Sequence, residues 1–109
     1  MQARGDRVIV KFRTNELLKA YQDLRYATKL WNEKIARLYA KRVDLLQSVK
    51  SAHELLMGHV FGFEGKSKGT PLAGKFTMRL DGFYRLVLSF EDDARTIVVI
   101  EEVSKHYCD

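Results

Sequence analysis

Residues 72–90 alternate between apolar and polar side chains on either side of a short turn that contains Asp-Gly. Such alternation predicts a β-hairpin, because successive residues of a strand point to opposite faces of a sheet. We expect Leu80 to lie opposite Tyr84, because this register gathers all the apolar side chains on one face. They are Phe76, Met78, Leu80, Tyr84, Leu86, Leu88 and Phe90. A two-residue Asp-Gly turn, the commoner use of that dipeptide, would pair Leu80 with Phe83 and put an arginine onto the apolar face.

The other face of the predicted hairpin carries two arginines. In the register that we expect, Arg79 lies directly across from Arg85. Like charges in directly opposed positions are destabilising unless an anion lies between or over them. Arginine suits a phosphate, because its planar fork donates to two oxygens at once. The pair therefore predicts a phosphate site. The alternative is that Glu101 or Glu102, which alternate along the last predicted strand, neutralises one of the arginines.

The length of 109 residues and the globular composition indicate one domain, residues 1–109. The sequence has no apolar run long enough to cross a membrane, and its lone Cys108 cannot form an internal disulfide. Residues 1–12 lack the apolar run of a secretory leader, so we expect no such leader. We therefore expect a cytoplasmic protein. The net charge of +5 favours an anionic partner such as RNA, DNA or an acidic protein, the alternative being a surface of solvated lysines. The excess of basic over acidic residues is largest in residues 65–90, which hold Lys66, Lys68, Lys75, Arg79 and Arg85 against Asp81 alone.

The order of predicted elements is β-α-α-β-β-β. Residues 8–12 read as a strand, and residues 6–57, which hold no glycine or proline, show apolar side chains at helical spacing. We expect two helices in this stretch, with a break near residues 26–30. Thr14 or Asn15 is the expected N-cap of the first helix and Asn32 that of the second. Four basic residues are expected on the solvated outer side of the second helix: Lys34, Arg37, Lys41 and Arg42.

The remaining segments complete a small α+β domain. Residues 58–74 hold five glycines and the only proline and are expected to be a loop, and residues 91–95 a turn. Residues 96–103 predict a well-covered last strand, because their first half is apolar on both faces. We expect a mainly antiparallel sheet with the two helices packed on one face.

The last strand delivers His106 and Tyr107 just past its end, toward the face of the two arginines. Cleavage of RNA by its own 2′-hydroxyl needs cationic donors, a base and an acid, but no metal or cofactor. Histidine is the natural proton carrier near neutral pH, and a tyrosine can stack on a base or donate from its phenol. His53 and His59 lack other ligands at metal-binding spacing, so we predict no metal site and no cofactor.

The hairpin motifs resemble those of the RelE/ParE superfamily of type II toxins from bacterial toxin-antitoxin modules, in particular its HigB-like (plasmid maintenance killer) branch. The residues that carry the resemblance are Leu72-Ala73-Gly74, Met78-Arg79-Leu80, Tyr84-Arg85-Leu86, and the strand 97–103 running into His106-Tyr107. The helices match in order and length only. The chain ends in Ser-Lys-His-Tyr where the branch often ends in an Asp-Tyr-His-like sequence, so the roles of the last two residues could be exchanged.

The resemblance implies a RelE-like fold and a ribosome-dependent endoribonuclease that cuts mRNA and is held inactive by a cognate antitoxin in a hetero-oligomer. Arg79 and Arg85 would bind the scissile phosphate, and His106 and Tyr107 would supply the proton carrier. The basic loop residues expected to contact RNA are Lys66, Lys68 and Lys75. Two alternatives remain open: a ParE-like, non-enzymatic inhibitor of gyrase, and a catalytically degenerate member that only binds a partner.

Overall fold

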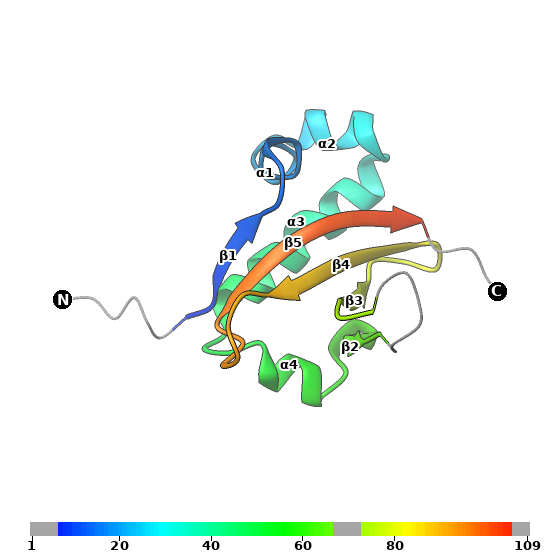
Figure 1. Cartoon of the computed structure of the whole chain (residues 1–109). Helices are drawn as coiled ribbons and strands as arrows, with labels where there is room; N and C mark the ends of the chain where they lie inside the picture. The colour runs from blue at the N-terminus through cyan, green and yellow to red at the C-terminus, as the bar shows by residue number, and fades with distance from the viewer. Residues whose placement is uncertain (1–6, 67–72, 106–109) are drawn as a thin grey trace.

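A five-stranded sheet forms one layer of the molecule, and helices cover one of its faces (Figure 1). The computed structural model describes residues 7–66 and 73–105. The strand order is β1-β5-β4-β3-β2, with β1 parallel to β5 and the other neighbours antiparallel. The strands are β1 (Ile9–Phe12), β2 (Glu64–Gly65), β3 (Phe76–Arg79), β4 (Tyr84–Phe90) and β5 (Ile97–Lys105). The α+β class and the mainly antiparallel sheet are as predicted.

The helical half differs from the prediction of two helices. The helices are α1 (Asn15–Gln22), α2 (Leu24–Leu30), α3 (Glu33–Ser48), α4 (His53–Met57) and the 3-10 helix η2 (Val60–Gly62). Residues 26–30, where we expected the break, lie inside α2, so that prediction is wrong. The helical stretch breaks at two points instead, at residues 31–32, between α2 and α3, and at Asp23. The backbone N–H of Asp23 donates to the carbonyl of Lys19 and ends α1, while its side chain accepts from the N–H groups of Arg25 and Tyr26 and begins α2.

Two predicted caps are confirmed. The hydroxyl of Thr14 accepts a hydrogen bond from the N–H of Leu17 at 3.1 Å, and the side chain of Asn32 accepts from the N–H of Ile35 at 2.9 Å. Each satisfies one of the amide groups that the first turn of a helix leaves without an intrahelical partner. The long helix α3, which Asn32 caps, runs along one face of the sheet (Figure 1).

The hairpin has the register in which Arg79 pairs with Arg85 and Met78 with Leu86. The three loop residues 81–83, between the paired Leu80 and Tyr84, are held by Asp81, whose Oδ1 accepts from the N–H groups of Phe83 and Tyr84 at 2.8 and 2.7 Å. Burial opposes ionisation of this carboxyl, but the two amides and nearby Lys34 outweigh it and lower its pKa. Because the Asp81 side chain accepts from both of these N–H groups, it stabilises a three-residue loop in preference to the two-residue Asp-Gly turn.

The core lies between α3 and the inner face of the sheet. Side chains of the hairpin and β5 pack there against one stripe of α3 and are inaccessible to solvent: Met78, Leu86, Leu88, Val98, Ile100, Ile35, Tyr39, Val43 and Leu46. The buried Tyr39 donates its hydroxyl hydrogen to the carbonyl of Leu17 at 2.7 Å, which ties α3 to α1. As predicted, β5 is an inner strand, with β1 on one side and β4 on the other.

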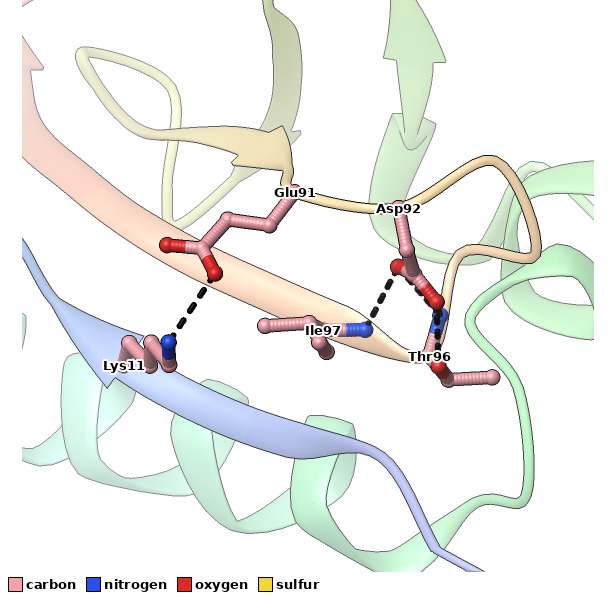
Figure 2. Close-up of polar contacts among 5 residues, drawn as sticks. All are labelled: Lys11, Glu91, Asp92, Thr96 and Ile97. Carbon is pink, nitrogen blue, oxygen red and sulfur yellow. Dashed lines mark hydrogen bonds and ion pairs between the residues drawn. The ribbon is translucent and has the colours of Figure 1, made fainter.

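A polar cluster holds the turn between β4 and β5 (Figure 2). Asp92 accepts from the backbone N–H of Thr96 and Ile97, at 3.0 and 2.9 Å, and from the Thr96 hydroxyl. The side chain of Lys11 on β1 reaches across β5 to Glu91 at 2.9 Å. These contacts fix where β5 begins, and therefore its register against β4.

Part of the predicted loop 58–74 is ordered structure, since it contains η2 and β2. The short β2 pairs with β3, with Glu64 opposite Thr77. Helix α4, which precedes it, was not predicted. No helix in the described part of the chain is long and apolar enough to cross a membrane.

Candidate phosphate-binding site on the hairpin

Arg79 and Arg85 lie directly opposite each other on neighbouring strands, as predicted. The next pair toward the loop is hydrogen-bonded, since Leu80 N–H donates to the carbonyl of Tyr84 at 2.9 Å. Because such pairs alternate with non-hydrogen-bonded pairs, the two arginines occupy the latter kind, in which side chains come closest. Arg79 is exposed and Arg85 is half-buried. Across residues 7–66 and 73–105, neither arginine makes an ion pair with a carboxylate.

The two glutamates of β5 do not alternate as we expected. Val87 pairs with Glu102 but the next residue, Leu88, pairs with Ile100, so Glu101 is the extra residue of a bulge. Both carboxylates therefore lie on the face of Arg85. Glu101 accepts from the Ser89 hydroxyl at 2.6 Å and lies 3.5 Å from Nη1 of Arg13, toward the β1 side of the sheet. The alternative of a neutralising glutamate has no support among the described contacts.

A third arginine reaches the same end of the hairpin from the helical layer. We expected Arg42 on the solvated side of its helix, and this is wrong, because only 6% of it is exposed. Its Nε donates to the carbonyl of Arg79 at 3.1 Å, and its Nη2 lies 3.5 Å from the carbonyl of Leu80. Burial lowers the pKa of Arg42, and the nearby charge of Arg79 lowers it further. The helical spacing of the sequence could have predicted that Arg42 is buried. It follows Ile35 by seven positions and Tyr39 by three, which places it on the buried stripe of α3.

The segment before β2 packs closely on both Arg42 and Arg79. The ring of Phe61 lies over the Arg42 guanidinium, with Cζ 3.5 Å from the ring centroid. Gly62 has φ +68°, and a Cβ at this residue would lie 3.1 Å from Nη1 of Arg79. Glycine suits this position, because it adopts the left-handed backbone without strain and leaves room for the guanidinium. Neither residue was singled out from the sequence as a site residue.

The predicted lysines lie at the far end of the same strands. The N–H of Lys66 donates to the carbonyl of Lys75 at 3.0 Å, which places the two beside each other, and Lys66 Nζ is 3.3 Å from Glu64. Lys75 is four residues before Arg79, roughly 13 Å along an extended strand. These lysines extend the basic face but do not join the arginine pair.

Three predicted site residues, Lys68, His106 and Tyr107, lie outside the described residues. The structure does describe β5, the strand that precedes His106 and Tyr107 in the sequence. Ser104 pairs with Arg85, and Lys105 pairs with Tyr84, so β5 ends beside the arginine pair.

A hollow of about 270 Å³ lies elsewhere, between the helices α1 and α2 and the C-terminal half of β5. The residues that line it include the apolar Leu17, Leu30 and Trp31 and the carboxylates of Glu101 and Glu102. Carboxylates disfavour an anion at this hollow. In the described part of the chain, no three His, Cys, Asp or Glu side chains are grouped so that they could hold a metal ion.

Comparison with solved structures shows that the fold is a known one. No family model matches the sequence, and no curated protein matches it. Among solved structures, the chain is similar to one from the YoeB-YefM complex of Staphylococcus aureus, with a TM-score of 0.56 and 17% identity over 93% of this chain and 99% of that one. It is also similar to a chain of the toxin-antitoxin complex RelBE2 of Mycobacterium tuberculosis, with a TM-score of 0.48 and 23% identity over 92% and 99% of the two chains. The first similarity shows that the whole α+β domain has a known fold. The HigB-like branch stays a prediction.

Proposed function

We propose that this protein is the toxin of a type II toxin-antitoxin module, an endoribonuclease that cuts mRNA on the ribosome. The observation that carries the proposal is the opposed pair Arg79 and Arg85, which lacks a carboxylate counter-ion among the described residues. Two guanidiniums held that close are most stable with an anion between them. A phosphate of RNA is the anion that fits both the fork geometry and the net charge of +5.

The likeness to a chain from the YoeB-YefM complex supports a partner protein. That chain comes from a complex of two named proteins, and the sequence motifs resemble those of toxins that an antitoxin inhibits. We infer that a cognate antitoxin binds this protein in a hetero-oligomer. A basic surface that includes Lys66, Lys75 and the arginine pair suits acidic segments of such a partner.

The proposed reaction is transfer within the RNA strand. The 2′-oxygen attacks its own phosphorus while a base takes its proton, the P–O5′ bond breaks, and an acid protonates the leaving 5′-oxygen. The product is a 2′,3′-cyclic phosphate, which can open to a 3′-phosphate. Arg79 and Arg85 donate hydrogen bonds to the phosphoryl oxygens, where negative charge increases in the transition state.

His106 and Tyr107 are the proposed proton carriers, on the sequence alone. His106→Gln keeps hydrogen bonds but cannot exchange a proton at neutral pH, so it should slow cleavage more than it weakens RNA binding. Tyr107→Phe keeps the ring for stacking and deletes only the hydroxyl. Comparing kcat for the two variants assigns the proton carrier, and full activity in both would remove these residues from the mechanism.

The test of the proposed function supplies purified protein with mRNA on translating ribosomes, because an open sheet face does not by itself align naked RNA for attack. We expect cut mRNA whose new 3′ ends carry a cyclic or linear phosphate. The parallel assay measures supercoiling by gyrase. Intact mRNA together with arrested supercoiling would replace the ribonuclease by a gyrase inhibitor. No effect in either assay would leave a degenerate partner-binding protein.

A further inference from the structure

Phe61 is a large apolar side chain in an unusual setting. Its backbone is left-handed, with φ 53°, and so is that of His59, with φ 50°. This region of backbone space is sterically unfavourable for bulky residues and persists only where surrounding structure enforces it. The side chain is only partly buried in return, since 44% of Phe61 is exposed. Neither local conformational preference nor core packing accounts for an aromatic residue here.

One face of the Phe61 ring is covered by a group that cannot easily move. The Arg42 guanidinium lies 3.5 Å from the ring centroid and is itself fixed by the carbonyls of Arg79 and Leu80. The exposed area of the ring must therefore lie on its edge and on its opposite face. A fixed aromatic ring with one free face is what a nucleobase needs in order to stack.

The ring is also close to the candidate phosphate site. The residue after Phe61 is Gly62, which packs against the guanidinium of Arg79. Consecutive Cα atoms are about 3.8 Å apart. The backbone of Phe61 therefore lies next to Gly62, the residue that packs against Arg79. A phosphate on the arginine pair and a base on the ring could then belong to the same or an adjacent nucleotide.

We propose that the free face of Phe61 is a stacking subsite for a nucleobase of single-stranded RNA, next to the phosphate held by Arg79 and Arg85. This inference rests on the proposed function for the identity of the ligand. Arg42 is the positioning residue, because it holds the ring from behind while it fixes the carbonyl of Arg79. Stacking on an aromatic ring accepts any base, so the subsite contributes affinity and alignment rather than sequence selection.

The competing explanation is that Phe61 only shields the buried Arg42 from water. The two explanations predict different results for Phe61→Leu, which keeps an apolar cover and removes the aromatic face. A stacking subsite predicts that KM for ribosome-bound mRNA rises roughly tenfold, while the midpoint of urea unfolding changes little. Phe61→Trp should restore KM. An unchanged KM in a folded Phe61→Leu variant would overturn the inference.

A second measurement needs no catalysis. In Phe61→Trp, the indole should be quenched on addition of a short 2′-O-methyl oligoribonucleotide, which cannot be cleaved because its 2′-oxygen is blocked. The matched control is Leu24→Trp, since Leu24 is an exposed apolar residue with 39% of it exposed and lies on α2, outside the hairpin that carries Arg79 and Arg85. Both variants keep Trp31, so its signal is common to them. We expect quenching in the first variant well above that in the control, and equal quenching would overturn the inference.

The two measurements also separate this inference from the proposed function. Quenching by the oligoribonucleotide together with intact mRNA on ribosomes would reject the nuclease and keep the RNA subsite. Cut mRNA together with no quenching difference would reject the subsite and keep the nuclease.

Discussion

Nε of Arg42 donates a hydrogen bond to the carbonyl oxygen of Arg79 at 3.1 Å, across 37 positions of sequence. The bond joins the middle of α3 to the end of β3, directly behind one of the two arginines proposed to bind phosphate. A buried guanidinium here satisfies carbonyl groups at the point where the hairpin leaves the sheet.

Arg42→Lys should therefore lower the free energy of unfolding by about 1–3 kcal/mol, since the ammonium cannot reproduce the two-carbonyl contact and leaves a buried acceptor unpaired. Urea unfolding measures the change. The control is Arg37→Lys, on the exposed side of the same helix, which should stay within about 0.5 kcal/mol of the unmodified protein. Equal effects in the two variants would show that the carbonyl contacts do not stabilise the fold.

Thr77 on β3 is fully buried, and its hydroxyl has no hydrogen-bond partner among the described residues. Thr77→Val replaces that hydroxyl with a methyl group of similar size, so we expect the free energy of unfolding to rise by about 1 kcal/mol. The matched control is Thr96→Val, which deletes a hydroxyl that donates to Asp92 and should lower stability. Thermal unfolding measures both changes: we expect a gain of stability in Thr77→Val and a loss in Thr96→Val. A loss of stability in Thr77→Val would contradict the account.

The turn between β4 and β5 should make stability depend on acid pH. The Thr96 hydroxyl, together with the N–H groups of Ile97 and Thr96, lowers the pKa of Asp92 below its usual 3.8, although desolvation opposes the shift. A carboxyl with a lowered folded-state pKa stabilises the protein fully above the unfolded value and loses this contribution as the pH falls through the folded value.

The comparison is between the unmodified protein and Asp92→Asn. The difference in free energy of unfolding should be constant near neutral pH and shrink below pH 3.8. A series of urea titrations from neutral to acid pH measures it. A difference that does not change over this range would mean that the Asp92 charge does not stabilise the turn.

Binding of the proposed antitoxin should depend on ionic strength. The protein carries a net charge of +5, and attraction between a basic surface and acidic segments is screened by salt. We expect the association rate constant, measured by stopped flow, to fall as salt is added while the dissociation rate changes less. An association rate that salt leaves unchanged would remove charge steering from the account of this interface.

The features that local sequence predicted correctly were those that a few neighbouring residues determine. The hairpin register followed from alternation, because the wrong register would have split the seven apolar side chains between the two faces of the hairpin. The N-caps at Thr14 and Asn32 followed from side-chain chemistry. The break between the two predicted helices was placed slightly too early, and the break at Asp23 was missed, because no glycine or proline marks either one. One carboxylate, that of Asp23, both interrupts and restarts the helix.

The parts of the site that sequence missed depend on contacts between distant segments. Simple alternation put Glu101 and Glu102 on opposite faces, and only pairing with β4 reveals the bulge that puts them on the same one. From the sequence, Arg42 was predicted to lie with three other basic residues on the solvated side of its helix. Its burial depends on carbonyl groups of a strand that lies 37 positions later.

The central claim is that the opposed arginines hold the scissile phosphate, and the rate of mRNA cleavage by Arg85→Ala on programmed ribosomes tests it most directly. Removing one donor from the transition state should lower the single-turnover rate about 100-fold or more. The far-ultraviolet circular dichroism should stay unchanged, because the side chain is only half-buried. Arg37→Ala, which removes an exposed guanidinium from the outer side of α3, should cleave at the normal rate. A folded Arg85→Ala variant that cleaves as fast as the unmodified protein would contradict the account.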